Sequence, residues 1–205
     1  MTIDSQLIFI SNKLTANQLV VVDEFIPLTE VSKFKRYFIN LQKQNKIKTA
    51  GIGKANQYVQ NIAIRGDSIA WLSSDEIRAI STLFFEKFEQ LIQHLNRRFY
   101  LGINTYEAHL ACYPIGSFYQ KHLDVFKTNS DRKVTFILYL NENWKKGDGG
   151  ELRIRASSTQ QIEPLAGRLV LFFSDAIEHE VLITHQPRYS LTGWFKSSIN
   201  TLIDK

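Results

Sequence analysis

The chain has 205 residues, of which 44% are hydrophobic and 22% charged, so its composition excludes a disordered or fibrous protein and allows one well-buried core. Its 25 basic and 20 acidic residues give a net charge of +5, but the basic residues are scattered, which favours an ordinary solvated surface over one that binds nucleic acid. The longest apolar runs are strand-sized and far short of the about 20 residues that cross a bilayer, so no membrane span is expected.

The first half of the chain is expected to form a strand followed by helices. Residues 19–26, LVVVDEFI, are typical of a strand, and a helix is expected over residues 29–42. A second helix is predicted over residues 73–99, because Ser73 and Glu76 have the spacing of a capping box. The apolar residues of this helix then fall on one stripe. That stripe consists of Ile77, Ile80, Phe84, Phe88, Leu91 and Leu95.

Two features favour a reducing cytoplasm as the location. Residues 1–14 contain Asp4 and no basic segment or long apolar stretch, so they do not resemble a secretory signal. Cys112 is the only cysteine of the sequence, which excludes an intramolecular disulfide and any zinc or iron–sulfur site built from cysteines. We therefore expect a cytoplasmic protein.

The second half is predicted to be all β. From about residue 104 the hydrophobic period changes to two, and short apolar runs alternate with turn signals such as YPIG, KKGDGG and LAG. Strands are predicted at residues 105–113, 118–124, 132–140, 151–155, 168–174, 179–183 and 188–196. We expect an α+β fold, mainly β in its C-terminal half, with a jelly-roll (double-stranded β-helix, cupin-like) or barrel core packed on an N-terminal helical layer.

The sequence shows no internal repeat and no linker, so a single domain, 1–205, is expected. Its helical layer would cover about residues 20–100 and its β core about residues 104–197.

A histidine and an aspartate two positions apart in YQKHLDVFK, residues 119–127, are the first candidates for a metal site. Alternate side chains of a strand share a face, so His122 and Asp124 would point the same way. His179 follows the turn SDAIE and can lie at the mouth of a barrel. Two histidines and one carboxylate form the facial triad that leaves positions on Fe(II) open, although zinc would accept the same ligands. For His94 and His109 we expect a structural position with satisfied nitrogens or a surface position, and for His185 a surface position.

An arginine on the strand after His179 favours a site that also binds a dicarboxylate. Alternation in RYSLTGWF places Arg188, Ser190, Thr192 and Trp194 on one face of the strand. A guanidinium that points into a barrel beside a metal needs a compensating charge, and a bidentate carboxylate is its natural partner. A dicarboxylate cosubstrate would satisfy both the metal and Arg188, whereas a surface arginine on an edge strand is the alternative.

Several longer motifs accompany these candidates: ACYPIGSFYQKHLD, LYLNENW, DGGELRI, IEPLAGRLVLFFSD and RYSLTGWF. These motifs follow one another in the order found in the iron(II)- and 2-oxoglutarate-dependent oxygenases, and the chain resembles that family over about residues 20–197. The likeness is to the prolyl hydroxylase group, which includes the oxygen-sensing hydroxylases, and KHLDVF and LTGWF look more like its bacterial members. The loop 51–67 corresponds to a region that family members use to cover a protein substrate, but its sequence here is its own. Within it, Arg65 to Asp67 is expected to form a turn with an internal ion pair.

The resemblance implies a role for each candidate residue. The implied iron ligands are His122, Asp124 and His179. The implied cosubstrate-binding residues are Arg188, Tyr139, Tyr113, Thr192 and Trp194. Arg188 would pair with the distal carboxylate of 2-oxoglutarate, and Tyr139 would donate a hydrogen bond to the same carboxylate. For Tyr113 and Tyr139, the alternative is a core aromatic with a satisfied hydroxyl.

The activity implied by the resemblance is hydroxylation of a prolyl residue in a protein, with Fe(II), 2-oxoglutarate and O2, and with succinate and CO2 released. Ascorbate is a further candidate cofactor, oxygen sensing a candidate role and a translation factor a candidate partner, while a membrane or nucleic-acid partner is not expected. The alternatives are the same chemistry on a nucleic acid or small molecule, and a non-catalytic cupin-like binding module. Trp194 and Phe195 stand where nucleic-acid repair relatives would carry a second arginine. A degenerate module would be expected to have lost a ligand or Arg188.

Overall fold

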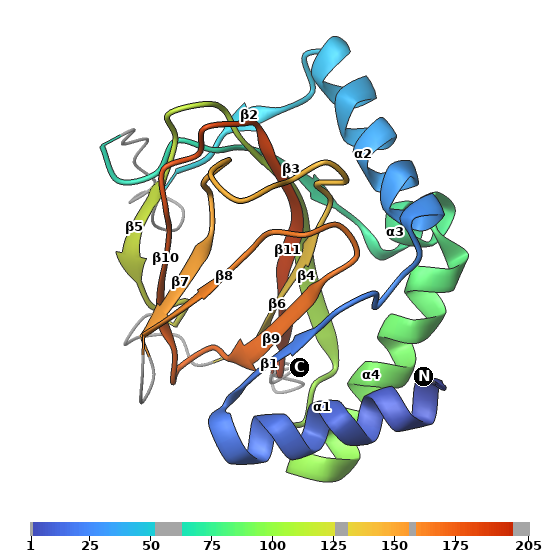
Figure 1. Cartoon of the computed structure of the whole chain (residues 1–205). Helices are drawn as coiled ribbons and strands as arrows, with labels where there is room; N and C mark the ends of the chain where they lie inside the picture. Colours follow the sequence, from blue (N-terminus) through green and yellow to red (C-terminus); the bar gives the residue numbers. More distant parts are fainter. Residues whose placement is uncertain (1, 52–62, 126–130, 156–158, 199–205) are drawn as a thin grey trace, which may run out of the picture.

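The computed structural model describes residues 2–51, 63–125, 131–155 and 159–198, in which helices cover one side of a pair of antiparallel sheets (Figure 1). The larger sheet lies between the helices and the smaller sheet. This arrangement confirms the predicted α+β fold with a jelly-roll core on a helical layer. Among the helices of these residues, none is long and apolar enough to span a membrane.

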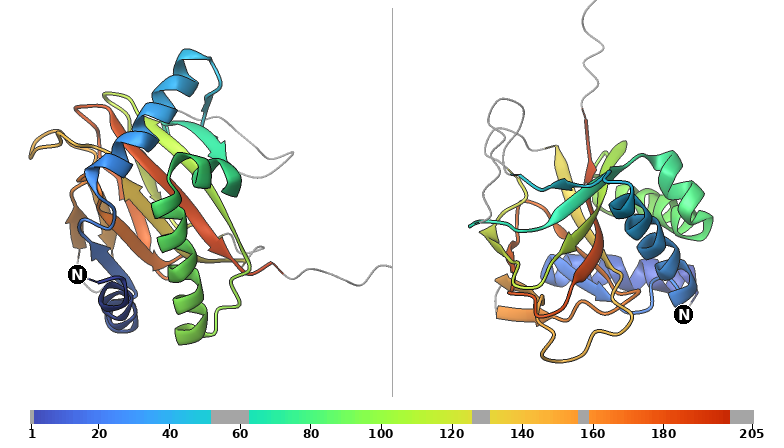
Figure 2. Two further views of the ribbon diagram at one scale, coloured as in Figure 1. Left: turned by 90° about the vertical axis from the view of Figure 1, so that its right-hand side faces the viewer. Right: turned by 90° about the horizontal axis from the view of Figure 1, so that it is seen from above.

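The helices of the described residues are α1 (Ile3–Asn17), α2 (Leu28–Lys43), α3 (Ser74–Ile80) and α4 (Thr82–Phe99). The first of them, α1, is missing from the predicted elements, although Leu7, Ile10 and Leu14 repeat at helical spacing and are buried. Thr2 caps this helix by accepting a hydrogen bond from the Ser5 amide. Figure 2 shows α2, α3 and α4 lying in front of the larger sheet.

The predicted helix over residues 73–99 is wrong in one respect, because Ser81 divides it in two. The capping box of Ser73 and Glu76 is confirmed at the start of α3. Ser81 has an extended backbone and accepts the Phe84 amide at 3.0 Å, so it caps α4. Its hydroxyl also donates to the buried Glu30 carboxylate at 2.7 Å. An apolar stripe predicts which face of a helix is buried, but it carries no sign of a break that a distant carboxylate stabilises.

The strands are β1 (Leu19–Val22), β2 (Lys48–Thr49), β3 (Ser68–Leu72), β4 (Thr105–Tyr113), β5 (Tyr119–His122), β6 (Arg132–Tyr139), β7 (Leu152–Arg155), β8 (Thr159–Ile162), β9 (Leu169–Phe173), β10 (Glu178–Val181) and β11 (Arg188–Lys196). The larger sheet has the order β1-β9-β6-β11-β4-β3-β2 and the smaller sheet β5-β10-β7-β8. Each predicted strand is present with small shifts at its ends, and the one predicted at residues 19–26 stops at Val22. β2, β3 and β8 were not predicted, because they are short and lack a clear alternation of apolar residues.

Two apolar clusters fill the space between the layers. The cluster between the helices and the larger sheet contains closely packed rings, such as Phe88 and Phe136 with centroids 4.6 Å apart. Leu191 and Phe195 of β11 face this cluster, as the predicted alternation requires. The opposite face of β11, with Arg188 at its start, looks into the space between the two sheets, where the candidate site lies.

Candidate active site

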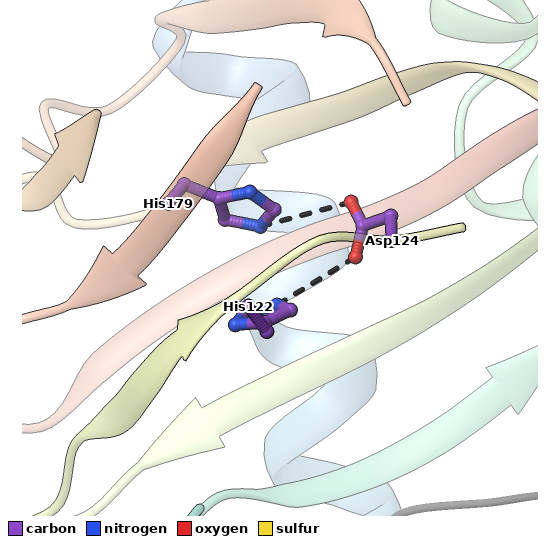
Figure 3. A group of neighbouring side chains, drawn as sticks. All are labelled: His122, Asp124 and His179. Atoms are coloured by element: carbon purple, nitrogen blue, oxygen red, sulfur yellow. Dashed lines mark ion pairs between the residues drawn. The ribbon is translucent and has the colours of Figure 1, made fainter. Parts of the chain in front are cut away.

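The three predicted metal ligands meet between the two sheets (Figure 3). β5 pairs with β10 so that His122 lies opposite His179. Asp124 reaches between the two imidazoles: its Oδ1 is 3.6 Å from His122 Nε2, and its Oδ2 is 3.7 Å from His179 Nε2. β5 ends at His122, so the turn after the strand, rather than strand alternation, brings Asp124 to the cluster. One ligand atom from each residue lies within 4.8 Å of the others, a spacing that suits a single cation with ligands at about 2.0–2.2 Å.

Both imidazoles are oriented by main-chain carbonyls. His122 Nδ1 lies 2.7 Å from the Gln120 oxygen, and His179 Nδ1 lies 3.1 Å from the Ile177 oxygen. A carbonyl oxygen only accepts hydrogen bonds, so each Nδ1 carries the proton and each Nε2 keeps its lone pair. Both lone pairs face Asp124, and this outer hydrogen bonding is typical of histidines that bind a metal. The donor set therefore fits a divalent cation such as Fe(II).

Asp124 is kept ionised by its neighbours. Burial of this carboxyl opposes ionisation, but the nearby imidazoles of His179 and His122 and the hydrogen bond from Thr135 outweigh it, so its pKa lies well below the ordinary value. Thr135 donates to Asp124 Oδ2 at 2.8 Å and lies 2.9 Å from the Ser174 hydroxyl. A threonine has one hydroxyl proton, which goes to the carboxylate, so Ser174 must donate to Thr135. Thr135 was not predicted from the sequence, where it is one apolar-flanked residue of a strand.

The cluster opens onto a cavity of about 390 Å³, and Arg188 lines the same cavity. Arg188 is only 3% exposed, and its Nε donates to the Gly150 carbonyl at 2.8 Å. Within the described parts of the chain, no carboxylate lies within ion-pair distance of this guanidinium. Since a buried charge is stable only when it is compensated, Arg188 fits an anionic ligand such as a carboxylate.

The two predicted tyrosines lie against Arg188. Its guanidinium is 4.9 Å from the ring centroid of Tyr113 and 5.0 Å from that of Tyr139. Tyr113 lines the cavity, and burial raises the pKa of its hydroxyl far above the ordinary value. Tyr139 is fully buried outside the cavity lining, and among the described residues its hydroxyl forms no hydrogen bond of ordinary geometry, although it lies beside Arg188. Thr192 and Trp194 both line the cavity.

A further stack of side chains, which the sequence did not reveal, supports His122. The imidazole of His122 stacks on Tyr119 with ring centroids 3.7 Å apart. The Arg65 guanidinium lies 4.4 Å from the centroid of the same Tyr119 ring. It donates hydrogen bonds of 2.7 and 2.6 Å to the Asp67 carboxylate, which hold it in place. The predicted ion pair within the RGD turn is thus confirmed. Of the predicted loop 51–67, residues 52–62 lie outside the described residues.

The remaining histidines differ in how well they match their predictions. His185 is exposed, as predicted, and His94 is half-buried on α4. His109 is buried, as a structural position requires, because its side chain is only 3% exposed. The expectation of satisfied nitrogens is not met, since its Nδ1 has no hydrogen-bond partner among the described residues and the side chain lines the cavity. Its alternation with apolar residues in β4 was the signal of burial, but a sequence pattern does not show whether a buried nitrogen has a partner.

Comparison with known proteins shows which family the chain resembles. The profile of the 2OG-Fe(II) oxygenase superfamily matches residues 108–196. The chain is 38% identical over 142 residues to Egl nine homolog 1 of Homo sapiens, an alignment that covers 64% of this chain and 33% of that protein. It is 37% identical over 143 residues to prolyl hydroxylase EGLN3 of Homo sapiens, with 64% of this chain and 59% of that protein covered. The chain therefore spans less than two thirds of the length of these curated relatives.

Two solved structures are similar over nearly the whole chain. A prolyl-4-hydroxylase from Pseudomonas putida has a TM-score of 0.83 and 32% identity, and the match covers 94% of this chain and 100% of that chain. A prolyl hydroxylase from Trichoplax adhaerens, in complex with a peptide fragment of the hypoxia inducible factor oxygen degradation domain, has a TM-score of 0.85 and 28% identity, with 95% of this chain and 90% of that chain covered.

Proposed function

The chain belongs to the 2OG-Fe(II) oxygenase superfamily, and on this premise we propose that it hydroxylates a prolyl residue in a protein substrate. The observation that carries the proposal is the presence, in one cavity, of the His122–Asp124–His179 cluster and of Arg188, a buried cation without a carboxylate partner among the described residues. The prolyl hydroxylases among the similar proteins support the choice of substrate.

In this proposal each residue of the site has one task. His122, Asp124 and His179 hold Fe(II) on one side and leave its other positions open. Arg188 receives the distal carboxylate of 2-oxoglutarate, and the unpartnered hydroxyl of Tyr139 supports this end of the site. When bound, these groups and O2 supply the oxidising chemistry that hydroxylates a substrate C–H bond while 2-oxoglutarate becomes succinate and CO2.

The side chains between the metal ligands and Arg188 prepare the cavity for this chemistry. Ile137, Leu152 and Val181 also line it, and these apolar side chains offer water no hydrogen-bond partner. A low-dielectric lining strengthens the attraction between Arg188 and a carboxylate. The chain thus supplies orientation at both ends and a dry wall between them.

The first test is anaerobic visible spectroscopy of the purified protein while Fe(II) and then 2-oxoglutarate are added. We expect a new charge-transfer band in the wild type, because 2-oxoglutarate chelates the iron, and no band in His122→Ala. Absence of the band despite confirmed iron binding would contradict the assignment of both ends of the site.

The finer parts of the proposal rest on the resemblance to bacterial prolyl hydroxylases. They are a cytoplasmic location, a translation factor as the substrate, ascorbate as a further cofactor, and a role in oxygen sensing. The prolyl hydroxylase relatives do not favour the alternatives, which were nucleic-acid or small-molecule oxidation and a binding module without catalysis. Mass spectrometry tests the proposed class of substrate, by comparing proteins from cells that express the wild type with proteins from cells that express His122→Ala. The substrate protein should carry hydroxyproline only in cells with the wild type.

A further inference from the structure

His109 is a buried imidazole that lines the candidate active site, and one of its nitrogens has no hydrogen-bond partner among the described residues. It lies on β4, it is 3% exposed, and its Nδ1 has no hydrogen-bond partner in the described structure. A buried polar atom without a partner destabilises a fold, and an apolar side chain would avoid this cost. Such an atom in a cavity wall points to a ligand that hydrogen-bonds there.

The ring of His109 is held in place by two indoles. Its centroid is 4.8 Å from that of Trp71 and 5.6 Å from that of Trp194, and we call these three residues the aromatic strip. Trp71 is 54% exposed at one end of the strip. At the other end, Trp194 is covered by the Arg132 guanidinium at 3.5 Å, which also donates to the main-chain oxygen of Asp124. The strip therefore leads from solvent to the candidate metal ligands.

The strip lies away from the proposed cosubstrate position. In the pairing of β4 with β11, His109 is opposite Thr192, whereas Tyr113 is opposite Arg188. Four residues along a strand separate these two rows by about 13 Å. On its other side β4 pairs with β3, where Trp71 lies opposite His109. His109 thus lies beside the exposed Trp71 and in a different row of the sheet from Arg188.

The chemistry of the imidazole suits a peptide group. Burial lowers the pKa of His109 to about 4, so the ring is neutral at neutral pH. A neutral imidazole offers one donor and one acceptor. Trp194 adds a buried indole N–H that also has no partner among the described residues. A peptide main chain supplies the complementary carbonyl oxygens and amide hydrogens.

We propose that His109 is a specificity-determining residue that hydrogen-bonds the main chain of the substrate polypeptide beside the target prolyl residue, with the aromatic strip as the surface on which this segment lies. The inference rests on the proposed function and deepens it, because it assigns a substrate contact to a residue outside the metal and cosubstrate ends of the site.

Stability provides a test that does not depend on activity. His109→Phe keeps a flat ring between the indoles and removes the unpaired nitrogen, and His109→Leu serves if the larger ring does not fit. The matched control is His94→Phe, because His94 Nε2 on α4 is also buried, has no partner in the described part of the chain, and lies outside the cavity. We expect at least one of the His109 variants to melt at or above the wild-type temperature, as His94→Phe should. The proposal would be overturned if both His109 variants melted several degrees below the wild type while His94→Phe did not, because Nδ1 would then have a structural partner.

Kinetics test the substrate contact itself, with a synthetic peptide library that has one fixed proline and varied neighbours. We expect His109→Phe to raise the KM of the best peptide about tenfold, equivalent to about 1.4 kcal/mol, while kcat stays within about twofold. His109→Gln, which restores a polar atom, should recover part of the loss, and His94→Phe should have no effect. Succinate formed without peptide and the KM for 2-oxoglutarate should also stay unchanged.

The outcomes separate this inference from the proposed function. An active wild type with an unchanged peptide KM in His109→Phe would overturn the inference alone. A raised KM for 2-oxoglutarate would also overturn it, because His109 would then contact the cosubstrate. A wild type that shows no charge-transfer band and hydroxylates no peptide would overturn both.

Discussion

The hydrogen bond from Thr135 to Asp124 makes a sharp prediction about metal affinity. Thr135→Val keeps the shape of a side chain that is 1% exposed but removes the hydroxyl that donates to Asp124 Oδ2 at 2.8 Å. A hydrogen bond to a charged group contributes about 1.5–3 kcal/mol, and about 1.4 kcal/mol corresponds to a factor of ten in affinity. Because the loss leaves one oxygen of a metal ligand less firmly oriented, we expect metal affinity to fall about 10–100-fold.

The assay is titration with Mn(II), followed by the electron paramagnetic resonance signal of the free ion. Thr135→Ser keeps the hydroxyl and should bind the metal nearly as the wild type does. Thr192→Val removes a hydroxyl from another part of the cavity, where its partner is Ser190, and should leave the metal affinity unchanged. A folded Thr135→Val protein with wild-type metal affinity would refute the reasoning.

Three further predictions concern the other end of the site and the helical layer. Arg188→Lys should weaken 2-oxoglutarate binding at least about tenfold while Mn(II) affinity stays unchanged, because an ammonium cannot form the two parallel hydrogen bonds of a guanidinium. The prediction would be contradicted if the charge-transfer band of the variant and that of the wild type appeared at the same 2-oxoglutarate concentration. Gly150→Ala should also weaken 2-oxoglutarate binding, since a Cβ there would lie 2.9 Å from Arg188 Cδ, whereas Gly147→Ala, with a positive φ but nothing within 4 Å, should cost stability alone. Hydrogen bonds from Lys33 and Ser81 lower the pKa of Glu30, despite the opposing effect of burial, so its charge stabilises the fold above the ordinary pKa of 4.5 and this contribution is lost as the pH falls below that value. Glu30→Gln should therefore flatten the acid side of the plot of melting temperature against pH, and an unchanged slope would show that Glu30 is not responsible.

The sequence was most informative where a local pattern has a local cause. The capping box of Ser73 and Glu76 and the strand over residues 188–196 appear as predicted, because both depend on neighbours within a few residues. The length of the second helix was predicted incorrectly for the opposite reason. Ser81 ends α3 through a bond to Glu30, which lies 51 residues earlier in the chain.

The candidate site shows the same division. The spacing of His122 and Asp124 and the position of Arg188 after His179 were readable from the sequence, because residue types and spacing carry that information. The partners that orient them were not: Ser174 supports Thr135 across strands, and Tyr119 stacks on His122. Such contacts depend on strand register and side-chain rotamers, for which a single sequence has no signal.

By itself, then, the sequence determined the class of fold and indicated the candidate metal ligands and the arginine that accompanies them. Only the tertiary structure decided that pairing of β5 with β10 sets His122 against His179, and that Arg188 has no carboxylate partner among the described residues. It also decided that His109 lines the cavity and that its Nδ1 has no partner in the described structure. The physical reason is that hydrophobic periodicity reports which side chains are buried, whereas hydrogen-bond satisfaction depends on which distant groups the fold brings within about 3 Å of each other.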